Sequence, residues 1–187
     1  TLKRFEMFNS LYPNYNFPKK INGVVVTPLP ELLNEIPWKK LYGGIPSFIH
    51  GDLQFDNILI NQASEDFMLI DWRQDFVNES EFGDVYYDIA KLYGGIILNY
   101  DLIKKGLFKI SQEESEVILD FAKRNMTKQY LDIFEQFIES KNLELDRVLL
   151  LVGLIYINMA PLHHEPFNFL LIALGTQILN KINFKEK

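Results

Sequence analysis

The chain has 187 residues, a formal net charge of −6 and a hydrophobic fraction of 48%. This length suits one ordinary globular domain or two very small ones. The acidic balance, without a Lys- or Arg-rich block, argues against a nucleic-acid-binding surface but is compatible with a small nucleotide held by metal ions. The absence of cysteine excludes disulfides, thiolate zinc sites and cysteine nucleophiles, and it allows a reducing compartment, so we expect a cytoplasmic location.

The N-terminal quarter is expected to wrap around the rest of the chain. Apolar residues at helical spacing predict a helix over 2–12, which Pro13 closes. Six prolines then interrupt the segment up to Pro46, so we expect a connector with a strand at 24–27 and a short helix at 31–36. The chain does not begin with Met, and we expect a processed chain or a fragment.

The middle of the chain predicts short strands followed by a helix. Apolar runs occupy 47–50, 58–60 and 67–70. The last two runs flank a polar turn and are expected to pair as a hairpin. After Gly83 the spacing becomes helical, with one apolar side formed by Val85, Ile89, Leu92 and Tyr93.

The C-terminal half predicts helices. Ser111 and Glu114 form a capping-box pattern, which predicts a long helix from there to about Ser140. Two more helices are expected, over 145–160 and 167–182. The apolar stretch in the first of them is too short for a membrane span, which needs about 20 residues.

Two residues that disfavour helical structure lie at or within these last helices. Pro161 is expected to stop the first of them. Gly175 lies inside the second, at a cost of about 1 kcal/mol relative to Ala in an ordinary helix.

Three polar residues around the predicted hairpin suggest phosphoryl-transfer chemistry. Asp52 precedes the first strand, Asn57 follows five residues later, and Asp71 ends the second strand. This is the spacing of a kinase catalytic loop and its metal-binding aspartate. The hairpin would bring the last two side chains to one edge, where amide and carboxylate oxygens suit Mg²⁺. A lone Asp-x-x-x-x-Asn is more often a turn, so the argument depends on the combination.

The segments 50–57, 70–72 and 83–91 together resemble the aminoglycoside phosphotransferase and choline kinase superfamily. The resemblance implies a protein-kinase-like fold, of which this chain would be the C-terminal lobe. The expected fold class is α+β and mainly α-helical, with a small β-hairpin carrying the catalytic and metal-binding residues. The implied reactants are ATP or GTP with Mg²⁺ and a small molecule with a hydroxyl.

The resemblance also implies roles for the polar residues of the motifs. Asp52 would be the catalytic base, assisted by Asn57, and Asn57 with Asp71 would bind magnesium. His50 would brace the loop rather than act as a base.

Four further residues receive supporting roles from the same resemblance. Leu59 and Ile70 would line the floor of the adenine pocket, although both are equally expected as core residues of the hairpin. Asp88 is expected to support the catalytic loop through hydrogen bonds. Asp84 is placed to cap the helix that starts beside it.

Other candidate groups have structural interpretations that we prefer. His163 and His164 lack the i, i+4 spacing of helical metal ligands, so a surface loop is expected there. Tyr86, Tyr87 and Tyr93 are expected in the core more than in an acceptor pocket.

The chain departs from the family pattern before its catalytic loop. Only 49 residues precede His50, and they contain no Gly-x-Gly-x-x-Gly, while Lys39 and Lys40 lack the strand context of an ATP-binding lysine. We therefore expect a linking helix and connector (1–46), catalytic and metal-binding motifs (47–91) and a helical subdomain (92–187). A nucleotide-binding lobe would be absent or would lie on a missing upstream segment or fused domain.

Three hypotheses follow from these observations. The leading one is an ATP-dependent kinase for a sugar, an aminoglycoside-like compound or an amino alcohol. Arg73 stands where choline kinases tend to carry an acidic residue, which puts choline in doubt. The alternatives are a non-catalytic kinase-like binding or regulatory module and, last, a metal-dependent phosphohydrolase.

Overall fold

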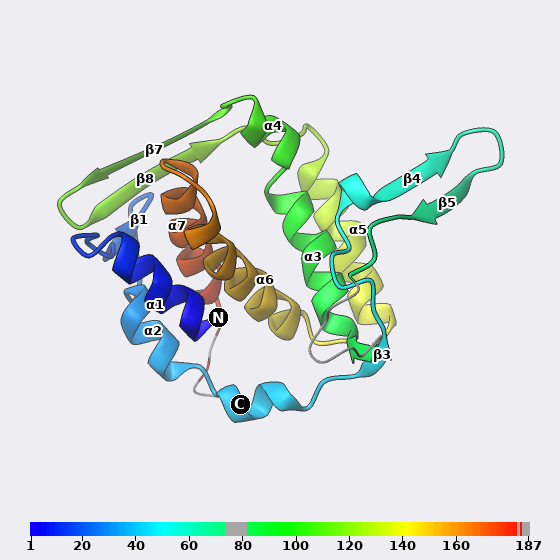
Figure 1. The fold of residues 1–187 in the computed structure, drawn as a ribbon, viewed down its shortest axis with the longest axis horizontal. Coiled ribbons are helices and arrows are strands. Elements are labelled where there is room, and N and C mark those ends of the chain that lie inside the picture. The colour runs from blue at the N-terminus through cyan, green and yellow to red at the C-terminus, as the bar shows by residue number, and fades with distance from the viewer. Residues whose placement is uncertain (74–81, 183, 185–187) are drawn as a thin grey trace.

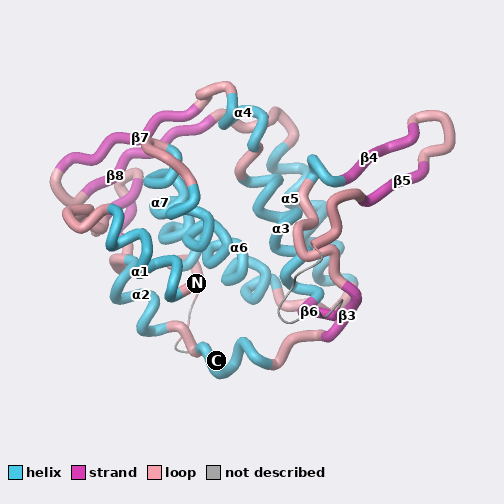
Figure 2. Tube along the Cα trace, in the orientation of Figure 1, coloured by secondary structure: helices cyan, strands magenta, loops and turns pink. Residues whose placement is uncertain are grey.

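The computed structural model describes residues 1–73, 82–182 and 184, and it shows an α+β protein in which helices form the body (Figures 1 and 2). Two long C-terminal helices occupy the middle, and a hairpin projects from one side. About half of the chain is helical, which agrees with the expected class and with a partial kinase-like domain.

The core is built around helices α6 (Leu145–Met159) and α7 (Phe167–Leu179), which pack against each other. Helix α3 (Val85–Ile97) packs on α6 from the other side, and α5 (Thr127–Ser140) packs on α3. Helices α3, α6 and α7 confirm the predicted ones to within a few residues, whereas α5 agrees with its prediction only at its C-terminal end. A 3-10 turn at Ala160–Leu162 follows α6 at the predicted proline.

One apolar helical stretch in the described residues, Leu145–Leu162, meets length and composition criteria for a membrane span. Half of it is buried inside the structure, where it contacts α3 and α7. Its hydrophobicity is therefore explained by its place in the core.

Helices α6 and α7 approach closely at a pair of glycines. A Cβ atom on Gly153 would lie 2.7 Å from the Leu179 side chain, and one on Gly175 would lie 3.0 Å from the Gly153 carbonyl oxygen. Gly175 is therefore a packing residue, and its helix propensity alone does not describe its contribution to stability.

We expect Gly175→Ala to lower the free energy of unfolding by about 1–3 kcal/mol, the usual cost of overpacking a core. Helix propensity alone predicts the opposite sign, a gain of about 1 kcal/mol. Urea unfolding distinguishes the two. Gly95→Ala in α3 is the matched control, because its Cβ would meet the half-exposed Phe55 ring, which can turn away, so it should not destabilise the chain. A stabilised Gly175→Ala would contradict the packing argument.

The predicted helix start at Ser111 is wrong. Residues on either side of it form a hairpin of β7 (Phe108–Glu113) and β8 (Glu116–Phe121), and the helix begins only at Thr127. The reason is visible in β8, where Val117 and Leu119 are buried while Ile118 between them is exposed. This alternation has the strand period, and it buries one face of the hairpin on α7, a gain that outweighs the local capping pattern.

The N-terminal segment lies against this body (Figure 1). Helix α1 (Leu2–Leu11) packs beside α6. The connector adds the strands β1 (Lys20–Ile21) and β2 (Val24–Val25) to the hairpin, which gives a four-stranded sheet with the order β2-β1-β8-β7. In this sheet β1 runs parallel to β8, and the other pairs are antiparallel. The remaining elements of the segment are α2 (Leu29–Glu35) and the 3-10 helix Trp38–Tyr42.

The predicted central hairpin is present. Strands β4 (Ile58–Asn61) and β5 (Asp66–Leu69) are antiparallel and project from the helical body (Figure 1). A second small sheet pairs β3 (Pro46–Phe48) with β6 (Phe82–Asp84) at the start of α3. The two sheets flank residues 50–57, which we call the 50–57 loop. That the hairpin carries catalytic residues stays a prediction, as does the division of the chain at residues 46 and 91.

Candidate active site

The 50–57 loop is attached to α3 through Asp88. The backbone N–H groups of His50 and Gly51 donate to the two carboxylate oxygens of Asp88, at 2.6 and 3.0 Å. Asp88 is only 8% exposed, so these bonds are shielded from water. Gly51 has φ +78°, a left-handed conformation that a residue with a side chain rarely adopts. One buried carboxylate therefore sets the backbone of the loop entrance.

His50 joins the loop to the end of β5. Its Nε2 lies 2.7 Å from the carbonyl oxygen of Ile70, and its Nδ1 accepts from the backbone N–H of Asp52 at 3.3 Å. Because Nδ1 accepts a hydrogen bond in this network, Nε2 is the ring nitrogen that donates to Ile70. His50 is 2% exposed and its ring packs beside Trp72. These contacts are those of a bracing residue.

Asn57 and Asp71 lie at the same end of the hairpin. The Asn57 side chain donates through Nδ2 to the carbonyl oxygen of Asp52 at 2.9 Å, and its backbone carbonyl accepts from Ile70 at 3.0 Å. Asp71 follows directly, with an exposed side chain and φ +57°, a conformation that Asp tolerates better than most residues.

These two residues form an incomplete set of metal ligands. Nδ2 of Asn57 is engaged as a donor, so its Oδ1 is the atom suited to a cation. Among the described residues no group of three or more His, Cys, Asp or Glu side chains is arranged to hold a metal. An Asn–Asp pair therefore fits Mg²⁺ only when phosphate and water oxygens supply the other ligands, as is usual for this ion.

Asp84 anchors the start of α3. Its carboxylate caps the helix by accepting from the Tyr86 N–H, accepts from the Ile45 N–H, and forms an ion pair with Arg147 of α6 at 2.9 Å. The sequence anticipated the cap, whereas Arg147 was not singled out. Through these bonds Asp84 ties α3 to the strand that leads into the 50–57 loop.

Lys91 contacts the predicted base and was not singled out from the sequence. Its Nζ lies 2.8 Å from Oδ1 of Asp52, and its side chain is 11% exposed. Lys91 follows Asp88 by three residues in α3, so the two side chains lie on one helix face. That spacing, together with the expected role of Asp88, was a signal that could have identified it.

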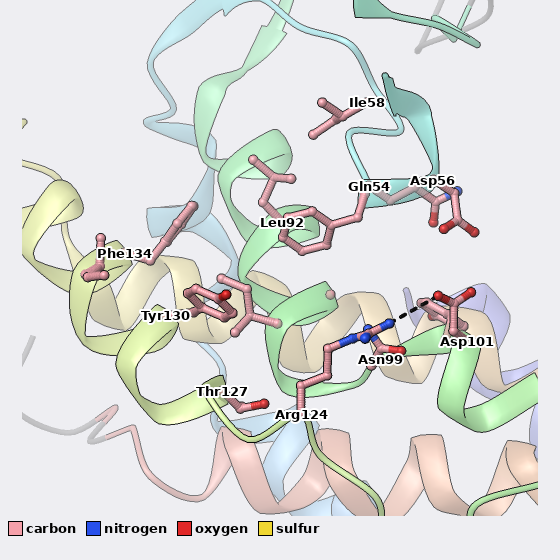
Figure 3. Close-up of a pocket in the computed structure, with 15 residues that line it drawn as sticks. Gln54, Asp56, Ile58, Leu92, Asn99, Asp101, Arg124, Thr127, Tyr130 and Phe134 are labelled. Carbon is pink, nitrogen blue, oxygen red and sulfur yellow. Dashed lines mark hydrogen bonds and ion pairs between the residues drawn. The ribbon is translucent and has the colours of Figure 1, made fainter. Parts of the chain in front are cut away.

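A cavity of about 600 Å³ lies beside the loop, between η2 (Phe55–Asn57), α3, α4 (Tyr100–Lys104) and α5. Figure 3 shows apolar side chains from α3 and α5, such as Leu92 and Phe134, and polar groups at the other end. The polar end contains Asp56 and the ion pair of Arg124 with Asp101, at 3.4 Å. The cavity can therefore take a small molecule with both apolar and polar parts.

Comparison with known proteins gives a match for the part of the chain that contains the 50–57 loop and α3. Residues 27–103 match the model of the phosphotransferase enzyme family. This part of the chain is therefore similar to that family over 77 residues. The resemblance inferred from the motifs is thereby confirmed, and phosphotransferase activity is the coarse function it implies. No curated protein and no solved structure matches the chain.

The other predicted residues of the matched segment lie in different surroundings. Leu59 is 48% exposed on the hairpin and Ile70 is half-buried at its base. Tyr86 and Tyr93 are buried in the helical core, at 4% exposure each. His163, outside the segment, packs its ring against Phe167, and burial lowers the pKa of its imidazole.

Proposed function

We propose that this protein is a phosphotransferase that transfers the γ-phosphoryl group of ATP to a hydroxyl of a small molecule. The observation that carries the proposal is the placement of Asp52. Its loop is fixed by Asp88 and His50, and its neighbours Gln54 and Phe55 line the cavity beside it. We place the acceptor in this cavity with its hydroxyl turned toward Asp52, because phosphoryl transfer to a hydroxyl requires a carboxylate.

The proposed roles follow the chemistry of each group. Asp52 orients the acceptor hydroxyl and takes its proton as the new O–P bond forms. Asn57 and Asp71 would hold Mg²⁺, which neutralises charge on the phosphates when bound. Leu59 and Ile70 would contact the adenine base.

The nucleotide also needs a covering lobe, which we propose lies on a segment upstream. The projecting hairpin exposes apolar side chains on both faces, because Leu59 and Ile60 are 48% and 60% exposed, and Phe67 and Met68 are 69% and 63% exposed. Adjacent strand residues point to opposite faces, so one partner surface on each face is needed to cover them. A nucleotide and a second lobe would provide such surfaces.

The charges of the cavity favour one part of the proposed acceptor range. The carboxylates that line it, Asp56 and Asp101, are each paired with a cation, Lys104 and Arg124. The described lining therefore has little excess negative charge to attract a polycation. A sugar or a singly charged amino alcohol suits it better than an aminoglycoside with several ammonium groups.

The proposal is tested by acceptor-dependent ADP formation in the full-length protein with Mg-ATP. A panel of sugars, amino alcohols such as ethanolamine and choline, and aminoglycosides serves as acceptors. We expect stimulation by at least one sugar or amino alcohol, and mass spectrometry should show the product heavier by one phosphate. If Mg-ATP binds by calorimetry but no acceptor is phosphorylated, the non-catalytic module is the better description.

We expect Ile133→Asp to raise the KM of the acceptor about tenfold or more, with little change in the KM of ATP. Ile133 lines the apolar wall of the cavity and is 55% exposed, so the substitution adds charge there without opening the core. Phe137→Asp is the matched control, one turn further along α5 and outside the lining, at 43% exposure. Equal effects of the two variants on acceptor KM would exclude this cavity as the acceptor site.

A further inference from the structure

We propose that Lys91 is a positioning residue that holds the carboxylate of Asp52 in its reactive orientation, an inference that rests on the proposed function. Its Nζ lies 2.8 Å from Oδ1 of Asp52, well within the distance of a charge-assisted hydrogen bond. The Lys91 side chain is 11% exposed and that of Asp52 is 34% exposed. Exposed pairs at protein surfaces contribute little, but here the ammonium is largely removed from water and needs its partner.

One rigid helix holds both the backbone and the side chain of the loop. Asp88 of α3 binds two backbone N–H groups at the loop entrance, and Lys91, on the same face, binds the carboxylate. The helix itself is fixed at its start by the Asp84 cap and its ion pair to Arg147. The position of Asp52 is therefore set by the helix and not by the loop alone.

Lys91 brings a positive charge to the Asp52 carboxylate, whose other hydrogen-bonding neighbours in the loop are polar. Gln54 Nε2 lies 3.5 Å from Oδ2 of Asp52, and Nδ1 of the His50 ring accepts from the Asp52 backbone N–H. Burial raises the pKa of Tyr100, with a further contribution from the charge of Asp52, so that this phenol stays protonated. An ion pair with Lys91 is thus what restrains the direction of the carboxylate.

The restraint decides which oxygen of Asp52 reacts. With Oδ1 held by the ammonium, Oδ2, which receives a long hydrogen bond of 3.5 Å from Gln54, is the oxygen that takes the proton of the acceptor hydroxyl. As this proton moves to Oδ2, the acceptor oxygen forms its bond to the γ-phosphorus, the bond from that phosphorus to the bridging oxygen breaks, and ADP leaves with the electron pair. A small misplacement of the carboxylate would slow this step, since errors near 1 Å can cost about 100-fold in rate.

The test compares Lys91→Met with Lys141→Met in the full-length protein, using the best acceptor found and Mg-ATP. Methionine is an unbranched side chain of similar length to lysine, but it has no charge. We expect kcat to fall about 10- to 100-fold in Lys91→Met, with the KM of ATP within about twofold of wild type. Lys141, exposed at the end of α5, should give wild-type kinetics.

A double variant separates positioning from a merely structural contribution. If Lys91 acts through Asp52, the kcat of Asp52→Asn/Lys91→Met equals that of Asp52→Asn alone, whereas independent contributions multiply. This comparison also holds if Lys91→Met folds poorly, because the double variant has no unpaired carboxylate at the site. The inference would be overturned if the losses of kcat in the two single variants multiplied in the double variant, or if Lys91→Met had wild-type kcat. Either result would leave the proposed function intact. Loss of the proposed function itself would instead appear as wild-type kcat in Asp52→Asn.

Discussion

Asp52→Asn should lower kcat by about 10²–10⁴-fold, the range expected when a general base is removed, while the affinity for Mg-ATP changes little. Asparagine has nearly the shape of aspartate, so the Lys91 and Gln54 contacts lose charge but the loop keeps its backbone bonds to Asp88. The loss should therefore be confined to the chemical step. Initial rates of ADP formation at saturating acceptor, with calorimetry of Mg-ATP binding, measure the two parts separately.

Asp120→Asn provides the control for this experiment. Asp120 is an exposed residue of β8, on the sheet that packs against α7 rather than beside the loop. The substitution Asp120→Asn removes one negative charge, as Asp52→Asn does, and should leave kcat within about twofold of wild type. A similar loss in both variants would mean that net charge, and not a base at Asp52, is responsible, and an unchanged kcat in Asp52→Asn would refute the assignment.

Asp88→Ala should be the most destabilising substitution at the site, lowering the free energy of unfolding by about 2–5 kcal/mol. Two backbone N–H groups, of the buried residues His50 and Gly51, lose their acceptor, and each buried unsatisfied donor costs about 1–3 kcal/mol. Urea unfolding of the chain measures this directly. Asp88→Asn keeps one acceptor oxygen and should lose less.

Asp101→Ala is the matched control for stability. It removes a carboxylate whose ion pair with Arg124 is 3.4 Å long and more than half exposed on both sides, so the change should stay within about 1 kcal/mol. If Asp88→Ala unfolds at the same urea concentration as this control, the carboxylate of Asp88 does not hold the loop.

Much of the site was predictable because its signals are local. The order of Asp52, Asn57 and Asp71 around a hairpin is a matter of spacing along the chain, and the hairpin itself follows from two short apolar runs around a polar turn. Asp84 as a cap depends only on the residues next to it. These features involve neighbours in sequence, so the pattern was sufficient.

The errors arose where distant segments decide. Ser111 and Glu114 match the capping-box pattern, yet the segment forms a β-hairpin. Its second strand, β8, pairs with β1 from the N-terminal part of the chain and packs on α7 from the C-terminal part. From the sequence, Gly175 is predicted to weaken its helix mildly. In the structure, a Cβ atom on Gly175 would lie 3.0 Å from the carbonyl oxygen of Gly153, so the glycine is required by packing. No local rule contains these contacts.

By itself the sequence determined the motifs that resemble phosphotransferases, within the matched residues 27–103, and most of the helices that carry an apolar face, because each depends on residue types at fixed spacing. Only the tertiary structure decided that Lys91 forms an ion pair with Asp52, that Arg147 forms one with Asp84, and that a cavity lies beside the 50–57 loop. The physical reason is that ion pairs and cavities depend on where helices pack against one another, and packing is a property of the whole core.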